Sequence, residues 1–215
     1  MSENPARLFE AGAGRQPDRA ILFQGDDRLT WATLERRAGR LAESLAERGI
    51  GPGDRVAIRL ENPTALTIAV IGALKTGATA TPLNPRLAAE EGTAILADLA
   101  PAVTVSELVD GEADFEARAV AGEAAAFILY TSGSTGRPKG VVLSHGAAGA
   151  ALADRRGPVM ALGPNDVVLS GLPPAHSFGL FGSILAPLSA AAAVVFLPRF
   201  TPEDALRLIA RHRVT

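Results

Sequence analysis

The sequence predicts an α/β fold in which largely parallel sheets are flanked by helices. Two observations carry this prediction. Segments with the apolar spacing of amphipathic helices alternate along the chain with short apolar runs typical of strands, and Gly, Pro or Asn separates many of them. Repeated strand–helix alternation favours parallel sheets, because each helix returns the chain to the same end of the sheet.

The first half of the chain is predicted to contain three helices and three short strands. The clearest helix covers residues 31–48, where apolar residues recur at spacings of four, three and four: Leu34, Ala38, Leu41 and Leu45. We expect the other two helices to begin at Pro63 and Arg86. The expected strands cover residues 56–60, 78–83 and 102–105.

A charged segment divides this half from the next. Residues 107–123 have few large apolar side chains and are expected to form a surface loop. We therefore predict a first α/β subdomain over residues 1–106, a connecting loop over 107–124 and a second subdomain over 125–215. The second is expected to hold strands at 125–130, 141–143, 167–172 and 193–197. Its helices are expected after Ser144, over 178–188, and from Pro202 with Leu206 and Ile209 facing inward.

Composition excludes several classes of protein. The 215 residues carry 21 basic and 23 acidic side chains, a net charge of −2, and no cysteine. This near-neutral balance argues against a nucleic-acid binder, and the lack of cysteine excludes disulfide frameworks and thiolate metal sites. The start has no signal-peptide pattern, so we expect a cytoplasmic protein. Residues 167–198 contain no Asp, Glu, Lys or Arg, but Pro173, Pro174 and Pro187 interrupt the stretch and favour a buried helix and strand there over a membrane span.

A loop rich in glycine and hydroxyl side chains carries the predicted chemistry. After Tyr130 the chain reads Thr131-Ser132-Gly133-Ser134-Thr135-Gly136-Arg137-Pro138-Lys139-Gly140. The glycines let backbone N–H groups converge on one point, and the four hydroxyls add further donors. Lys139, one of only two lysines in the chain, adds a cation. This combination suits a polyanion such as a triphosphate.

Other readings of glycine-rich loops fit less well. In a Walker A loop, Gly would precede the lysine and a helix would follow, whereas here Pro138 precedes Lys139 and a strand follows. Gly12-x-Gly14 lacks the preceding strand and the third glycine of a dinucleotide fingerprint. A plain Gly/Ser hairpin fits the composition but does not account for the full string.

The string Tyr130–Gly140 resembles the phosphate-loop signature of the adenylate-forming superfamily, [YF]-T-S-G-[ST]-T-G-x-P-K-G, at every fixed position. Further similar segments, in family order, are residues 51–57, 72–78, 82–86 and 172–179. The resemblance runs from Asp18 to the end, and it implies the N-terminal part of the large domain of such an enzyme. Residues 82–85, Pro-Leu-Asn-Pro, and 176–179, His-x-Phe-Gly, look like the acyl-CoA or aryl-CoA ligase branch rather than peptide-synthetase adenylation domains.

The resemblance implies an AMP-forming carboxylic acid–CoA ligase. Its co-substrates would be ATP and CoA, its favoured acid a fatty acid, and Mg²⁺ would arrive with ATP. The phosphate-binding residues would be Thr131, Ser132, Gly133, Ser134, Thr135 and Gly136, with electrostatic support from Lys139. His176, Phe178 and Gly179 would border the substrate pocket: His176 orients the carboxylate, and the other two serve packing and close approach. No protein metal site is expected. His145 is expected at a helix start without a catalytic role, and His212 is expected in solvent.

Segments that the family uses later in the chain are missing. They include the segment that holds adenine and supplies the Mg²⁺ glutamate, the ribose aspartate, and the lysine of the C-terminal domain. The last two residues, Val214 and Thr215, look like the beginning of a strand, so we expect a truncated N-terminal part whose activity alone stays open. The alternatives are a non-catalytic nucleotide-binding module and a membrane-associated scaffold that uses residues 167–198.

Overall fold

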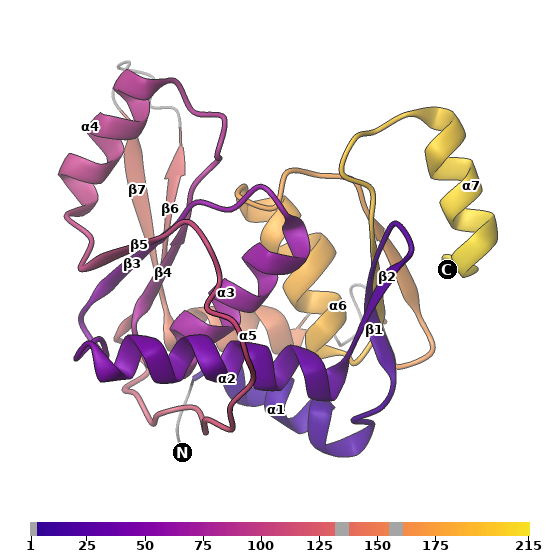
Figure 1. Ribbon diagram of the computed structural model, residues 1–215, viewed down its shortest axis with the longest axis horizontal. Helices are drawn as coiled ribbons and strands as arrows, with labels where there is room; N and C mark the ends of the chain where they lie inside the picture. Colours follow the sequence, from indigo (N-terminus) through magenta and orange to yellow (C-terminus); the bar gives the residue numbers. More distant parts are fainter. Residues whose placement is uncertain (1–3, 132–137, 155–160) are drawn as a thin grey trace. The chain divides into compact units, whose positions relative to one another are not determined.

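The computed structural model describes residues 4–131, 138–154 and 161–215. The chain forms two compact units. The first comprises residues 1–6 and 36–149, and the second comprises residues 7–35 and 150–215. Each unit is built around one sheet, and the elements are labelled in Figure 1.

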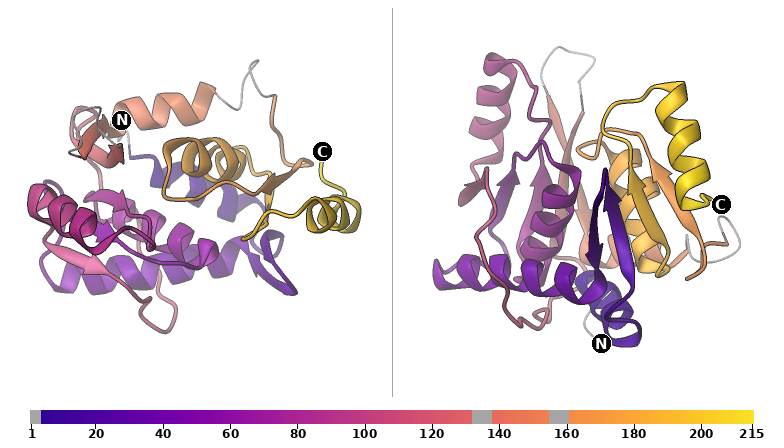
Figure 2. Two further views of the ribbon diagram at one scale, coloured as in Figure 1. Left: turned by 90° about the horizontal axis from the view of Figure 1, so that it is seen from above. Right: turned by 45° about the vertical axis from the view of Figure 1, so that its right-hand side comes forward.

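The sheet of the first unit has five strands. Their order is β5 (Val103–Val105), β3 (Arg55–Ile58), β4 (Thr79–Pro82), β6 (Ala125–Thr131) and β7 (Lys139–Ser144). All neighbours are parallel except β6 and β7, which form an antiparallel hairpin at one edge. The strands stand side by side in Figure 1 and in the right-hand view of Figure 2. The hairpin holds both ends of the glycine-rich loop.

Helices α2 (Trp31–Glu47), α3 (Pro63–Lys75), α4 (Ala89–Leu99) and α5 (His145–Asp154) lie wholly or partly in this unit. The four apolar residues that predicted α2 are all buried, so that prediction is confirmed. Helix α3 begins where the Asn62 side chain accepts a hydrogen bond of 2.9 Å from the backbone of Ala65. A Cβ at Gly72 would lie 2.9 Å from the carbonyl oxygen of Ala38, so glycine allows α3 to approach α2 closely.

The charged segment after β5 is irregular, as predicted, but it packs against α2 and α3. The Nζ of Lys75 donates a hydrogen bond of 2.8 Å to the carbonyl of Phe115, and the backbone of Arg118 donates one of 2.8 Å to Lys75. Arg36 forms a 2.8 Å ion pair with Glu112. These contacts keep the segment inside the first unit, so the compact units do not follow the predicted division at 107–124. Composition indicated a loop but not what the loop touches.

The second unit contains a four-stranded sheet. Its order is β2 (Asp27–Thr30), β1 (Ala20–Gln24), β9 (Ala193–Phe196) and β8 (Val167–Ser170). Only β1 and β2 are antiparallel, so the predicted α/β fold with largely parallel sheets is confirmed. The sequence did not predict β1, β2 or helix α1 (Ala6–Arg15). The turn between β1 and β2 contains Gly25 at φ +62°.

The uncharged stretch forms a buried helix followed by a strand, as predicted. It begins as a π-helix, η1 (Phe178–Leu185), continues as α6 (Ala186–Ser189) and turns into β9. Helix η1 is buried beyond Phe178, and α6 is buried throughout. In the described parts of the chain, no helix is long and apolar enough to cross a membrane.

Helix α7 (Pro202–His212) buries a different face from the one predicted. Leu206 is 68% exposed and Ile209 is 39% exposed, so their predicted inward orientation is wrong. The buried cluster that α7 joins comprises Val195, Leu197, Ala205 and Leu208. Ala205 and Leu208 have the same spacing of three as the predicted pair, so contact with the β9 segment, not periodicity, selects the buried face.

Candidate functional site

The predicted phosphate-binding loop joins β6 to β7 in the first unit. Pairing of the two strands extends from Ala125 opposite Ser144 to Thr131 opposite Lys139. The predicted loop residues Ser132, Gly133, Ser134, Thr135 and Gly136 lie outside the described residues. Because opposed residues of antiparallel strands share a face, Thr131 and Lys139 present a hydroxyl and an ammonium group on one face at the two ends of the loop. Both residues are exposed.

On the other face of this hairpin, the side chains of Ile128 and Tyr130 lie close to Gly140. A Cβ at Gly140 would lie 2.9 Å from Cγ2 of Ile128 and 3.3 Å from Cζ of Tyr130. The Tyr130 hydroxyl donates a 2.6 Å hydrogen bond to Oδ2 of Asp98 in α4. Burial, then this hydrogen bond and the charge of Asp98, raise the pKa of Tyr130 well above its usual value, so the phenol stays protonated. Sequence reasoning missed Asp98, and no motif or spacing marked it.

The residues predicted to border the substrate pocket lie in the second unit, where a turn leads from β8 into η1. The backbone N–H of His176 donates to the carbonyl of Pro173 at 3.1 Å, and its carbonyl accepts from Leu180 at 2.8 Å. Gly179 is buried, and a Cβ there would overlap the carbonyl oxygen of Pro173, so its predicted close approach is confirmed. Phe178 is 64% exposed, so the packing role predicted for it is not seen here.

The structure therefore assigns the predicted site residues to two groups. Thr131 and Lys139 lie together in the first unit and offer a cation and a hydroxyl, which are suitable partners for a phosphate. His176, Phe178 and Gly179 follow one another at a helix start in the second unit. The His176 imidazole and the Phe178 ring are both exposed.

The two histidines outside the predicted site, His145 and His212, differ in burial. His145 begins α5 and is fully buried, and burial lowers its pKa, an effect partly opposed by the backbone of Gly77. His212 was predicted to lie in solvent but is half-buried, because its ring packs near that of Phe23, with the two ring centroids 4.9 Å apart. Burial, and then the charge of Arg211, lower the pKa of His212.

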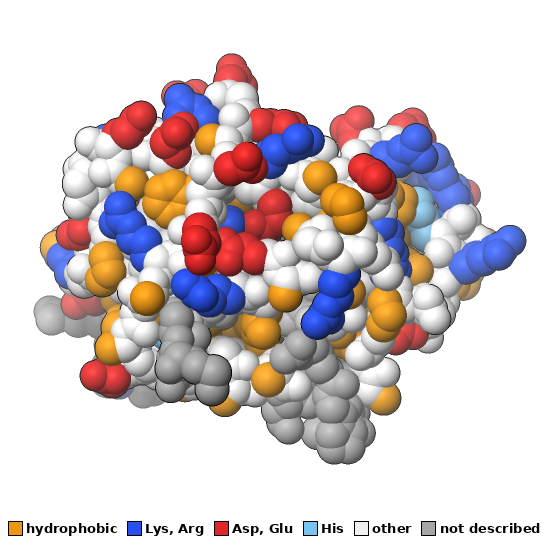
Figure 3. Space-filling model, turned by 90° about the horizontal axis from the view of Figure 1, so that it is seen from below, with side chains coloured by type: hydrophobic (Ala, Val, Ile, Leu, Met, Phe, Trp, Pro, Cys, Tyr) orange, Lys and Arg blue, Asp and Glu red, His pale blue; other side chains and the backbone are white. Residues whose placement is uncertain are grey.

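The described residues do not form a metal site of their own. Among them, no group of three or more His, Cys, Asp or Glu residues is arranged to hold a metal ion. On the face drawn in Figure 3, acidic and basic side chains are interspersed, and the described residues there form no extended basic patch. This distribution agrees with the near-neutral composition.

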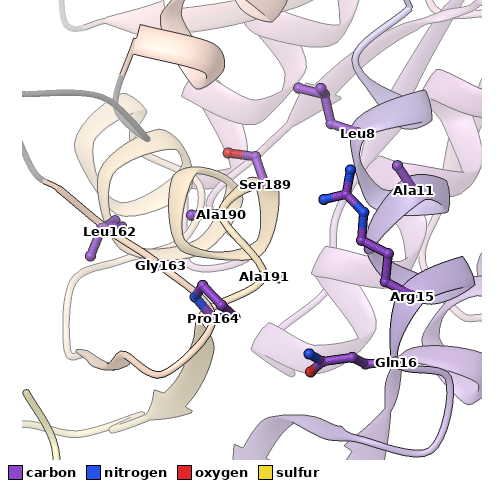
Figure 4. Close-up of a pocket in the computed structure, with 11 residues that line it drawn as sticks. Leu8, Ala11, Arg15, Gln16, Leu162, Gly163, Pro164, Ser189, Ala190 and Ala191 are labelled. Atoms are coloured by element: carbon purple, nitrogen blue, oxygen red, sulfur yellow. The ribbon is translucent and has the colours of Figure 1, made fainter.

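A separate cavity of about 220 Å³ lies within the second unit (Figure 4). Leu8, Ala11 and Arg15 of helix α1 line one side, while residues 162–164 and 189–191 line the other. None of the site residues predicted from the sequence contributes to this lining.

Comparison with known proteins identifies the family. The model of the AMP-binding enzyme family matches residues 9–124 and 105–215. The chain belongs to the AMP-binding enzyme family. The predicted resemblance to adenylate-forming enzymes is thereby confirmed. This AMP-binding chain is 34% identical over 213 residues to CymA of Salinispora arenicola, which is named as a probable nonribosomal peptide synthetase, and the match covers 98% of the chain.

Two solved structures share the fold of this AMP-binding chain. A Mycobacterium tuberculosis fatty acyl CoA synthetase superposes with a TM-score of 0.88 at 26% identity over 99% of the chain. ATP-bound MatB from Rhodopseudomonas palustris gives a TM-score of 0.85 at 27% identity over 98% of the chain. The chain spans 3% of CymA and 48% of each of these two structures. The relatives thus include both a peptide synthetase and a CoA synthetase.

Proposed function

We propose that the chain is the N-terminal part of a ligase that uses ATP to convert a carboxylic acid into an acyl adenylate and pyrophosphate. The ligase then transfers the acyl group to the thiol of CoA and releases AMP. One observation carries the proposal. The string Tyr130–Gly140 lies on a strand–loop–strand hairpin that places Thr131 opposite Lys139, in a chain that belongs to the AMP-binding enzyme family.

The chemistry explains why a cation and hydroxyls at this hairpin matter. A carboxylate oxygen attacks the α-phosphorus of ATP, a P–O bond forms, and the bond to pyrophosphate breaks. Negative charge increases on the departing pyrophosphate, so donors and cations already aimed at it lower the barrier. We assign this role to the ammonium group of Lys139, to Thr131 and to residues 132–136. We expect Mg²⁺ to arrive with the phosphates of ATP.

The His176 segment is the proposed place for the acid. His176 would orient the carboxylate, while Phe178 offers apolar surface beside it. The close approach at Gly179 fixes the turn that presents both side chains. We favour a fatty acid, because His176-x-Phe178-Gly179 resembles the acyl-CoA ligase branch.

A second acceptor has support of its own. The match to CymA favours a thiol on a carrier protein as the acyl acceptor instead of CoA. The residues Asn84 and His176 favour CoA, because peptide-synthetase adenylation domains usually have Asp and no His-x-Phe-Gly at these segments. Both acceptors follow the same adenylation step.

Exchange of radiolabelled pyrophosphate into ATP tests the adenylation step. The full reading frame is supplied with a panel of fatty, aryl and dicarboxylic acids, and we expect exchange that depends on one class of acid. Lys139→Ala should reduce exchange by about 10²-fold, whereas Arg86→Ala, an exposed cation in the same unit, should not. No exchange with any acid would contradict the ligase function. Addition of CoA or of a carrier protein to the adenylated enzyme then identifies the acceptor.

The alternative is a nucleotide-binding module without catalysis. Isothermal titration of the 215-residue chain with ATP, before and after Lys139→Ala, distinguishes the cases together with the exchange assay. ATP binding that requires Lys139, with no exchange in the full reading frame, would favour the module.

A further inference from the structure

The single tyrosine of the chain connects the glycine-rich loop to helix α4. Tyr130 is the residue before Thr131, near the end of β6, and its hydroxyl donates a 2.6 Å hydrogen bond to Asp98. Asp98 lies in the last turn of α4, next to Leu99, whose side chain is 3% exposed and belongs to the core. The ring of Tyr130 packs against the core cluster that contains Leu99. The phenol is therefore held by packing along its ring and by a carboxylate at its tip.

The position of the Tyr130 ring also affects the opposite strand, because the ring packs against Gly140 of β7. Tyr130 and Gly140 are paired across β6 and β7, and a Cβ at Gly140 would lie 3.3 Å from Cζ and 3.5 Å from the hydroxyl oxygen of the tyrosine. The ring thus lies directly against the backbone of β7 at this position. The next pair along the hairpin is Thr131 with Lys139. An interaction that restricts the position of the Tyr130 ring therefore also restricts the segment of β7 that carries Lys139.

The direction of the side chains matters as well. Successive residues of a strand point to opposite faces, so Tyr130 points toward α4 while Thr131 and Lys139 point away from it. The hydrogen bond between Asp98 and Tyr130 thus restrains the hairpin on the face that points toward α4. It leaves the opposite face, with Thr131 and Lys139, open to a ligand.

We propose that Asp98 is a positioning residue for ATP: through Tyr130 and Gly140 it orients the β6–β7 hairpin, and with it Lys139 and Thr131, toward the phosphates. This role rests on the proposed function, because it presupposes that the hairpin binds ATP. Asp98 acts through Tyr130 and does not touch the nucleotide. The raised pKa of Tyr130 keeps its hydroxyl protonated and able to donate throughout the neutral range.

The test uses the only tyrosine of the 215-residue chain as its reporter. Absorbance of tyrosinate is followed during an alkaline titration, and ATP affinity is measured by isothermal titration at neutral pH. The variants are Asp98→Ala, Asp98→Asn, Tyr130→Phe and the double variant Asp98→Ala/Tyr130→Phe. Glu91→Ala is the matched control, because Glu91 is an exposed acid on the same helix and its loss changes the net charge equally.

We expect Asp98→Ala to lower the ionisation midpoint of Tyr130 and to weaken ATP binding about fivefold, as loss of one hydrogen bond would. Tyr130→Phe should weaken binding similarly, and the double variant should bind no worse than Tyr130→Phe alone. Asp98→Asn keeps an acceptor oxygen and should retain most of the affinity. Glu91→Ala should change neither the midpoint nor the affinity.

Failure of the positioning role can be told apart from failure of the proposed function. If the unchanged chain binds ATP and Asp98→Ala binds it equally well, the positioning role is overturned and the nucleotide-binding function stands. If Asp98→Ala weakens binding as much in the Tyr130→Phe background as alone, Asp98 does not act through the tyrosine and the proposal is overturned. If the unchanged chain binds no ATP, the positioning role is overturned, and pyrophosphate exchange by the full reading frame decides the proposed function separately.

Discussion

Replacement of Leu208 by alanine should destabilise the second unit, whereas the same replacement at Leu206 should not. Leu208 is 6% exposed and packs in the cluster with Val195 and Leu197, while Leu206 is 68% exposed. Leu→Ala removes three carbons, and at about 0.8 kcal/mol for each buried carbon the loss at Leu208 is about 2.5 kcal/mol. Any cavity that remains adds to this loss. At Leu206 most of the side chain is already in water, and alanine is the better helix former, so the change should stay within about 0.5 kcal/mol.

Urea unfolding followed by tryptophan fluorescence measures this difference. Trp31 is the only tryptophan, is fully buried and lies in the same unit as α7, so its emission reports on the unfolding of that unit. Equal losses for the two variants would refute the packing described above. A larger loss at Leu206 would show that α7 buries the face with Leu206 and Ile209 instead.

Three further predictions concern stability. Gly179→Ala should cost about 1–3 kcal/mol, because the new Cβ meets a backbone carbonyl, whereas Gly14→Ala, where nothing lies within 4 Å, should cost nothing in the same thermal unfolding experiment. Burial lowers the pKa of His145 in the folded chain, so below about pH 6.5 the unfolded chain takes up a proton that the folded chain disfavours. The free energy of unfolding should therefore fall as the pH drops below about 6.5. The urea midpoint of His145→Asn should fall less steeply with pH than that of the unchanged chain. Lys75→Met should cost about 1–3 kcal/mol, because the carbonyl of Phe115 loses this donor. Limited proteolysis between residues 107 and 124 should become faster, and an unchanged cleavage rate would contradict the role of this hydrogen bond.

Local patterns predicted much of the fold because they depend on neighbours in the sequence. The spacing of Leu34, Ala38, Leu41 and Leu45 identified α2, and all four residues are buried. The same kind of pattern failed in α7, whose amphipathic sequence offers two faces with equal spacing. A helix cannot select between such faces by itself, because the free energy comes from the surface on which it packs.

At the candidate site, too, local patterns predicted some features and missed those that depend on long-range contacts. The string Tyr130–Gly140 identified the family, and the strand predicted after it is β7. The sequence also marked Gly179 as a close-approach position, although it did not indicate that the partner is the Pro173 carbonyl. Asp98 went unmarked, because it lies 32 residues from Tyr130 in the sequence. Their contact exists only because α4 packs beside β6.

By itself, the sequence determined the α/β class, the order of most helices and strands, and the phosphate-loop signature. Each of these depends on residue types within a few positions of one another. The tertiary structure decided which face of α7 is buried, that residues 107–124 bind to α2 and α3, and that Asp98 meets Tyr130. These outcomes depend on burial and hydrogen bonding between segments far apart in the chain, and no local pattern contains that information.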